Sequence, residues 1–196
     1  GSEAIAWGQP SEQPEASNLR RGKGMGMFIY RGGAGGKSIA RMRLESDGTL
    51  RLITGLMDVG EGSLTVMPQI AAEELGVDYE QVQVTFGDSA TTPEAPITAG
   101  STATFSTGTA TQEAARQLKE RIIEVAAPLL DADPSDLQIT SEGVAHVRYP
   151  ERGVTFSKIA ESAGEFEVEA SIMPGSRDHV INSFGAHFAE VEVDTD

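Results

Sequence analysis

The sequence predicts an α+β fold in which mixed sheets with hairpins pack against two main helices. Apolar residues recur at helical spacing in two long segments, residues 64–75 and 103–130. They alternate with polar residues in shorter segments, such as 39–44 and 50–53. These two patterns intermix without a regular strand-helix-strand order, which favours α+β over a parallel α/β fold. With 196 residues, 39% of them apolar, the chain can bury a substantial core.

The first residues of the chain show no periodic pattern of apolar residues. Its first two residues, Gly-Ser, read as a cloning remnant, and residues 9–23 mix prolines, serines and charges as linkers and surface loops do. We therefore divide the chain into residues 1–23, the remnant with a linker or surface segment, and residues 24–196, a domain. The last residues follow a strand pattern with no turn after it, so we expect a fragment of a longer protein, truncated at its C-terminus.

The first strands form a predicted hairpin. Residues 32–36 are rich in glycine but lack the Gly-Lys-Ser/Thr spacing of a phosphate-binding loop, so a turn or a close backbone approach is favoured. Residues 39–44 and 50–53 then alternate around Ser-Asp-Gly at 46–48, a sequence typical of turns.

A helix and a strand follow this hairpin. The helical spacing of residues 64–75 predicts the helix, with Ser63 as its N-cap and Gly76 as the left-handed glycine at its end. Residues 82–86 form the predicted strand, and residues 87–97 are an irregular segment with two prolines.

The second half of the chain repeats these element types. A long helix over 103–130 should end before Asp133-Pro134, because a residue that precedes proline disfavours the helical conformation. The other predicted elements are a hairpin of residues 137–139 and 144–147, a short helix at 156–159, and strands at 166–172 and 183–193.

Composition excludes several classes of function. Acidic side chains outnumber basic ones by 30 to 15, and a formal charge of −15 opposes nucleic acid or an anionic membrane as a general partner. Cysteine is absent, so the chain itself holds no disulfide, thiolate-ligated zinc or iron–sulfur cluster. No apolar run reaches the roughly 18 residues of a membrane span, and no secretion signal is visible. We expect a cytoplasmic protein.

Two loops that each lead into a helix are the candidate binding features. The glycine junction, residues 60–63, has the sequence Gly-Glu-Gly-Ser, and the hydroxyl loop, residues 98–104, has the sequence Thr-Ala-Gly-Ser-Thr-Ala-Thr. Such junctions point free backbone N–H groups and a partial positive charge outward, which suits an anion or a phosphate-bearing cofactor. The alternative is that both are ordinary helix caps that bind no ligand.

Other reactive side chains form no recognisable constellation. The histidines, at 146, 179 and 187, lie in separate elements without metal-ligand spacing, which favours structural roles. No Gly-x-Ser-x-Gly elbow supports a nucleophilic serine. Asp58 with Glu61, and likewise Asp88, either lie near a ligand or belong to turns, and the turn is favoured.

Four segments in order resemble the molybdenum-binding subunit of the xanthine dehydrogenase and aldehyde oxidase family. Residues 58–76 are similar to that family's glycine-glutamine-glycine segment and the helix after it, and residues 87–108 follow at matching spacing. Residues 21–26 are similar to the entry of a cofactor-domain half, and residues 184–194 to the strand that crosses into the family's next section. The resemblance covers residues 18–196.

The resemblance implies a partial molybdenum cofactor-binding domain in residues 24–196. It implies molybdopterin, in the cytosine dinucleotide form if the source is bacterial, with molybdenum held by the pterin dithiolene. Gly100 aligns with the position whose backbone amide lies next to the metal, where a residue without a bulky side chain suits a close approach. The residues implied to contact the cofactor are Gly60, Glu61, Gly62, Thr98, Ala99, Gly100, Ser101, Thr102, Ala103 and Thr104.

The parent protein is implied to be an oxidoreductase with further parts. It would oxidise an aldehyde, an N-heterocycle or an aromatic thioester with oxygen derived from water, activated by a glutamate in a Gly-Glu-x-Pro type segment well downstream. Its partners would be the rest of the molybdenum subunit, iron–sulfur (2Fe-2S) and possibly flavin (FAD) domains or subunits, and a small-molecule substrate. We expect the isolated fragment to be inactive.

Glu61 departs from the family pattern, which has glutamine at this position. Ionised glutamate only accepts hydrogen bonds and repels anions, whereas glutamine also donates. Glu61 could face a pterin N–H or amino group, could be protonated, or could belong to a lineage that handles its cofactor differently. A rival hypothesis is a non-catalytic binding or assembly module that keeps the fold and has lost the cofactor.

Overall fold

The computed structural model describes residues 1–16, 18–32, 36–173 and 182–196, which belong to two units. Unit 1 combines the first 32 residues with the last segment of the chain, and unit 2 holds the region between them. Each unit is described by itself. The glycine-rich stretch at 32–36 lies largely outside the described residues.

Unit 2 is built on a four-stranded mixed sheet, in the order β4-β3-β2-β8. Strands β2 (Ser38–Leu44) and β3 (Leu50–Thr54) are antiparallel, which confirms the predicted first hairpin. Strand β8 (Phe166–Ile172) pairs antiparallel with the other side of β2, and β4 (Val82–Phe86) runs parallel to β3.

The two faces of this sheet differ in chemistry. On β2, Ala40, Met42 and Leu44 are buried, while the arginines between them lie on the opposite, partly exposed face. There Arg41 pairs with Glu169 at 2.7 Å and Arg43 with Glu167 at 2.7 Å, each directly across from β8. The strict alternation therefore assigns one face to the core and the other to cross-strand ion pairs.

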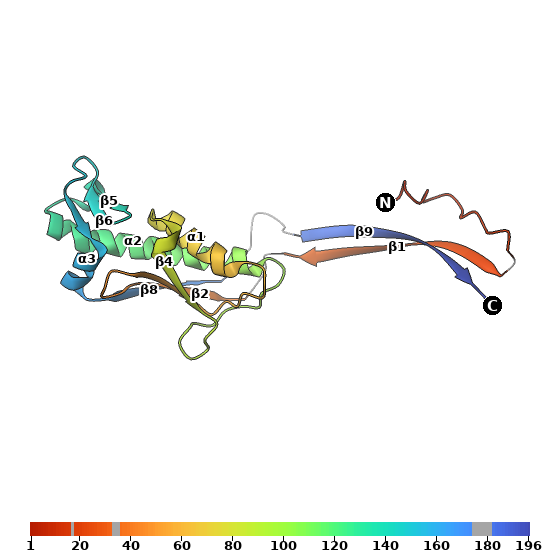
Figure 1. The fold of residues 1–196 in the computed structure, drawn as a ribbon, viewed down its shortest axis with the longest axis horizontal. Helices are drawn as coiled ribbons and strands as arrows, with labels where there is room; N and C mark the ends of the chain where they lie inside the picture. Colours follow the sequence, from red (N-terminus) through yellow and green to blue (C-terminus); the bar gives the residue numbers. More distant parts are fainter. Residues whose placement is uncertain (17, 33–35, 174–181) are drawn as a thin grey trace. The chain divides into compact units, whose positions relative to one another are not determined.

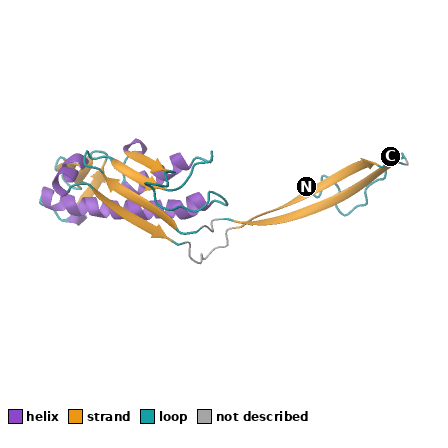
Figure 2. Cartoon of the chain, turned by 90° about the horizontal axis from the view of Figure 1, so that it is seen from below, coloured by secondary structure: helices purple, strands orange, loops and turns teal. Residues whose placement is uncertain are grey.

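Two helices cover the apolar face, as Figures 1 and 2 show. Helix α1 (Ser63–Leu75) and helix α2 (Gly108–Leu130), the latter preceded by a π-helical turn (Ala103–Thr107), pack on each other and on the sheet. Gly76 ends α1 in the left-handed conformation, with φ of 85°, as predicted. Helix α2 ends at Leu130 with Asp131 left-handed, two residues before Asp133-Pro134. The α+β prediction with two main helices is confirmed.

One strand-helix-strand unit went unrecognised in the sequence pattern. The parallel strands β3 and β4 are connected through α1, so the glycine junction lies in the connection that leaves the end of β3. Ligand sites of mixed and parallel sheets commonly form at such connections, because the backbone there leaves the sheet and is free to adopt special conformations.

A smaller antiparallel sheet packs near the C-terminal part of α2. Its strands are β5 (Leu137–Thr140), β6 (Gly143–His146) and β7 (Gly153–Thr155), followed by helix α3 (Phe156–Ala163). Short 3₁₀ turns at Tyr79–Gln81 and Pro134–Asp136 precede β4 and β5. The predicted second hairpin and the short helix are confirmed, whereas β7 was not predicted.

Unit 1 is a two-stranded antiparallel ribbon of β1 (Leu19–Arg31) and β9 (Asn182–Asp194), which lie side by side along their whole length (Figure 1). The prediction of a strand over 183–193 is confirmed. The interpretation of residues 9–23 as linker was wrong from Leu19 onward, because these residues pair with the far end of the chain and no local pattern signals that pairing. No helix among the described residues is long and apolar enough to span a membrane.

Candidate cofactor site

The glycine junction presents open backbone. Gly60 and Gly62 adopt φ values of 106° and 90°, and a Cβ atom placed on either would meet nothing within 4 Å. Gly62 is the N-cap residue of α1. Glycine is needed here for its positive φ, and the surrounding space is free to receive another molecule.

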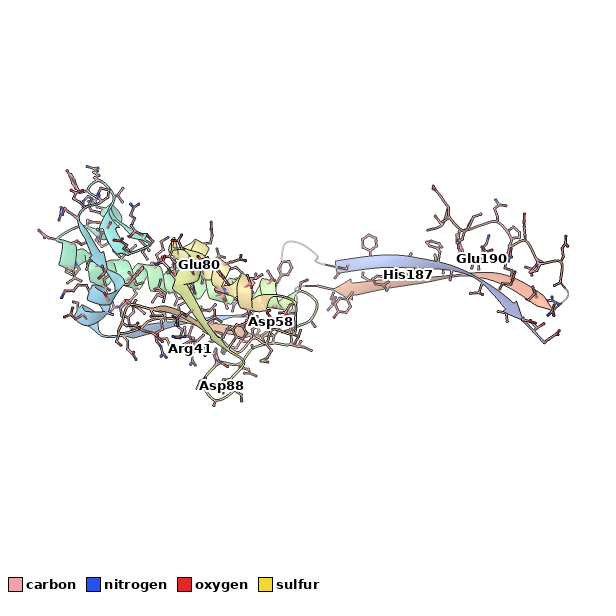
Figure 3. All side chains as sticks on the ribbon, in the orientation of Figure 1. Arg41, Asp58, Glu80, Asp88, His187 and Glu190 are labelled. Atoms are coloured by element: carbon pink, nitrogen blue, oxygen red, sulfur yellow. The ribbon has the colours of Figure 1, made fainter. Side chains whose placement is uncertain are left out.

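Asp58 organises this junction from within (Figure 3). Its carboxylate accepts hydrogen bonds from the backbone N–H groups of Gly60 at 2.7 Å and Leu64 at 3.0 Å, with a longer one from Gly62 at 3.5 Å. The bonds from Leu64 and Gly60 hold the pKa of Asp58 below its usual value. The sequence analysis suggested that backbone N–H groups of this junction bind a phosphate. Several of them instead donate to the carboxylate of Asp58.

Glu61 makes a second contact of the same kind. Its Oε2 accepts the backbone N–H of Val59 at 2.8 Å. The side-chain carbonyl of a glutamine could accept the same bond, so glutamate at this position can keep the local geometry while it adds a negative charge. With Asp58, the junction carries two carboxylates, both of which accept from loop amides, as the turn interpretation expects.

Ser63 was predicted to cap α1, and this was wrong. Ser63 is the first helical residue, the capping position belongs to Gly62, and no side-chain hydrogen bond is made from that position. The Ser63 Oγ atom is buried without a hydrogen-bond partner, as is Ser106 Oγ in the π-helical turn. Buried hydroxyls normally find partners, so these two groups are exceptions, and their burial keeps them out of direct reach of an external molecule.

The hydroxyl loop contains a tight turn. Gly100 and Ser101 both have positive φ, 56° and 64°, and the Thr102 N–H donates to the Ala99 carbonyl at 3.0 Å. Within the described part of the chain, no hydrogen bond engages the backbone N–H of Gly100 or Ser101. A non-glycine residue in the left-handed region is uncommon and is strained, a condition that proteins often hold at functional sites.

A direct contact joins the two predicted segments. The Thr98 hydroxyl donates to the backbone carbonyl of Met57 at 3.0 Å, immediately before Asp58. The structure thus brings the start of the hydroxyl loop against the start of the glycine junction, although they lie about 40 residues apart in sequence. Sequence reasoning did not single out Met57, whose contribution is a backbone carbonyl that carries no residue-type signal.

Members of the hydroxyl loop differ in what they expose. Ser101 and Thr104 are exposed, Thr98, Ala99 and Gly100 are partly buried, and the side chains of Thr102 and Ala103 are buried inside the protein. Thr104 also lines an open groove between α1 and the start of α2, of about 500 Å³. The hydroxyls that an external molecule could reach directly are therefore those of Thr98, Ser101 and Thr104.

Other candidate groups have structural partners. His146 is buried, and its Nδ1 accepts the backbone N–H of Arg148 at 3.1 Å, so its role is structural. His187 stacks on Phe28 in the ribbon, and His179 lies outside the described residues. Asp88 closes a turn by accepting the N–H of Ala90 at 2.9 Å. Across the described ranges, no group of three or more His, Cys, Asp or Glu could hold a metal ion.

Comparisons with known proteins agree with this architecture. A family model described as a molybdopterin cofactor-binding domain matches residues 1–196. The aldehyde oxidoreductase molybdenum-binding subunit PaoC of Escherichia coli (strain K12) is 33% identical over 202 residues, which cover 98% of this chain and 26% of that protein. The probable hypoxanthine oxidase XdhD of the same strain is 32% identical over 204 residues, which cover 100% of this chain and 20% of that protein.

Solved structures show the same fold. Quinoline 2-oxidoreductase from Pseudomonas putida 86 matches with a TM-score of 0.63 and 25% identity over 91% of this chain and 25% of that chain. A reconstituted CO dehydrogenase from Oligotropha carboxidovorans matches with a TM-score of 0.63 and 26% identity over 90% of this chain and 24% of that chain. The chain thus spans about a quarter or less of the proteins it matches. It belongs to the molybdopterin cofactor-binding domains of the xanthine dehydrogenase and aldehyde oxidase family.

Proposed function

We propose that this chain forms one wall of a molybdopterin pocket, with the glycine junction and the hydroxyl loop as its contact segments. One observation carries the proposal: the hydrogen bond from Thr98 to the Met57 carbonyl, at 3.0 Å, which places the two segments together. The free N–H groups of Gly100 and Ser101 then point to an acceptor on the cofactor, and Gly100 is the position we assign next to molybdenum.

The local charge of each segment indicates which part of the cofactor it would contact. Asp58 and Glu61 make the glycine junction acidic and already use several of its amides, which opposes a phosphate there. Carboxylate oxygens suit the N–H and amino donors of a pterin ring, whereas the hydroxyls and free amides of the hydroxyl loop suit its anionic oxygens. The open space at Gly60 and Gly62 also fits a bound organic group.

A bound molybdenum–molybdopterin cofactor would supply the two-electron redox chemistry, and this chain would supply binding and orientation. We propose that the parent protein oxidises an aldehyde, an N-heterocycle or an aromatic thioester with water-derived oxygen; relatives named for aldehyde and hypoxanthine oxidation support the first two classes. The cofactor would be the cytosine dinucleotide form, and the electrons would pass to 2Fe-2S and flavin groups on partner domains or subunits. The 196 residues alone would be inactive.

The test measures cofactor content in the full-length parent protein. Molybdenum is measured by mass spectrometry of the metal, and pterin by the fluorescence of its oxidised derivative. Gly100→Val strains the turn, because Gly100 has a positive φ, and adds a branched side chain next to the free amides, so it should lower both contents at least about tenfold, while Thr65→Val on the exposed face of α1 should retain both. A Gly100→Val protein with the wild-type melting temperature and full cofactor content would overturn the assignment.

The rival function, a non-catalytic assembly module, rests on the extra negative charge at Glu61. It predicts that the wild-type parent contains neither molybdenum nor pterin, and that Glu61→Gln does not restore them. Stoichiometric molybdenum in the wild-type parent excludes it.

A further inference from the structure

The ribbon of unit 1 has an apolar half, defined here as residues 25–31 of β1 and 182–188 of β9, which pair with each other throughout. Its side chains are unusually exposed for their type: Met27 is 75%, Ile29 71% and Phe184 84% accessible. Between Lys23 and Arg31 on one strand, and between Asn182 and Glu190 on the other, no Asp, Glu, Lys or Arg occurs. Isolated exposed apolar residues are normal, but a continuous patch of this kind marks a contact surface.

Both faces of the apolar half are largely apolar, with Arg31 and Asn182 at the end of one face and Ser183 and His187 on the other. Residues directly opposite in an antiparallel pair share a face, so Met27 and Ile29 lie with their partners Ala186 and Phe184 on one face. The other face carries Phe28 and Tyr30, and the Phe28 ring lies so close over Gly185 that a Cβ there would be 2.6 Å away. Strands that read as near-continuous apolar runs are typical of sheets covered on both sides.

The other half of the ribbon provides an internal contrast. There Arg21 pairs with Glu192 at 2.7 Å and Lys23 with Glu190 at 4.0 Å. The N-terminal segment packs on this half through Lys23, whose Nζ is bonded to the Ala6 carbonyl at 3.3 Å, and it reaches the boundary of the apolar half, where the Trp7 ring is edge-on to Phe188. This charged half is suited to water, and the apolar half is not.

Backbone groups add to the argument. Among the described residues, β1 and β9 form a sheet of two strands, so each has an outer edge of N–H and C=O groups that no third strand in this part of the chain satisfies. A two-stranded ribbon without a covering layer is at best marginally stable in water. A ribbon of 13 residue pairs therefore needs neighbours along its edges and over its faces.

We infer that the apolar half of the ribbon is an internal docking surface, covered in the parent protein by other parts of the same polypeptide, which add at least one strand to its edge. The argument for this occupant is length: relatives that match nearly the whole of this chain are about four to five times as long, since it covers 20% and 26% of them. A second copy of the ribbon would bring the same two-sided apolar surface and leave one of its own faces uncovered. This inference concerns assembly and does not depend on a bound cofactor.

The test compares amide hydrogen exchange, followed by mass spectrometry, in the 196-residue chain and in the full-length parent. Amides of residues 25–31 and 182–188 should exchange at least about 100-fold more slowly in the parent. Peptides from α2 serve as the reference, because their protection should be similar in both proteins. Equal exchange of the apolar half in both proteins would overturn the inference.

A pair of variants makes the test specific. Met27→Lys places a charge in the apolar half, whereas Val191→Lys, at a 55% exposed position, places the same charge in the charged half. In the parent, Met27→Lys should abolish the added protection and Val191→Lys should keep it. In the 196-residue chain both should leave the melting temperature unchanged. Protection that arises equally in a dimer of the 196-residue chain, and is lost with Met27→Lys there, would instead assign the surface to a second copy and overturn the inference.

Discussion

At the scale of the residue, Asp58 determines the shape of the glycine junction, because its carboxylate accepts from the amides of Gly60, Gly62 and Leu64. These bonds lower its pKa in the folded state. A carboxyl with a lowered folded pKa stabilises the fold above its unfolded pKa of about 4, and this contribution is lost as pH falls through the folded value.

We therefore expect Asp58→Ala to lower the melting temperature at pH 7, with a difference from wild type that shrinks steadily below about pH 4. Thermal unfolding followed by circular dichroism between pH 7 and pH 2 measures this difference. Glu73→Ala, on α1, is the control, since Glu73 is exposed and its side chain makes no hydrogen bond or ion pair within the described residues. A difference that is constant over the pH range would show that Asp58 does not act through its charge.

Single residues also show what sequence patterns can and cannot locate. Gly76 was predicted as the end of α1 because a left-handed C-terminal glycine is a strong local signal. Ser63 was assigned as the cap because caps are sought one residue before the helix, yet the capping carboxylate comes from Asp58, further upstream. The contact of Thr98 with the Met57 carbonyl could not be predicted, because any residue type can supply a backbone acceptor.

At the scale of the element, α2 organises unit 2, since it packs on β2, β8 and the smaller sheet. Leu118 is fully buried on this helix. Leu118→Ala should reduce the free energy of unfolding by about 3 kcal/mol, through lost apolar burial and the cavity left behind. Leu129→Ala, at a 42% exposed position on the same helix, should change it by less than about 0.5 kcal/mol. Urea unfolding of the two variants measures both values, and equal effects would contradict the packing described.

Elements with a strong local period were predictable, and those defined by distant partners were not. The alternation of β2 and the helical spacing of α1 and α2 follow from burial on one face. This burial produces a periodic pattern of apolar residues that is visible within a short stretch of sequence. Strand β1 contains glycines at 22, 24 and 26, which lower strand propensity, and β9, the strand with which it pairs, lies more than 150 residues away. The pairing of β1 with β9 therefore depends on contacts between distant segments, which no short stretch of sequence indicates.

At the scale of the whole molecule, the buried core and the proposed cofactor segments both belong to unit 2. The residues of the core cluster lie from Ala40 to Ile172, whereas all residues of β1 and β9 are exposed or only partly buried. Stability should thus be unevenly distributed, with the free energy of local opening lowest in the ribbon.

Limited digestion with trypsin should reveal this distribution in the 196-residue chain. Cleavage after Arg20, Arg21, Lys23 or Arg31 of β1 requires only opening of the exposed ribbon, while cleavage within α2 requires disruption of the core. We expect the β1 sites to be cut at least about 100-fold faster, leaving a resistant fragment that retains α1, α2 and the four-stranded sheet, identified by intact mass. Cleavage in α2 at the same rate as in β1 would mean that the two units open together. In the full-length parent the sites after Lys23 and Arg31, which border the apolar run of β1, should resist digestion as well. The covering strands would have to dissociate before the protease could bind there.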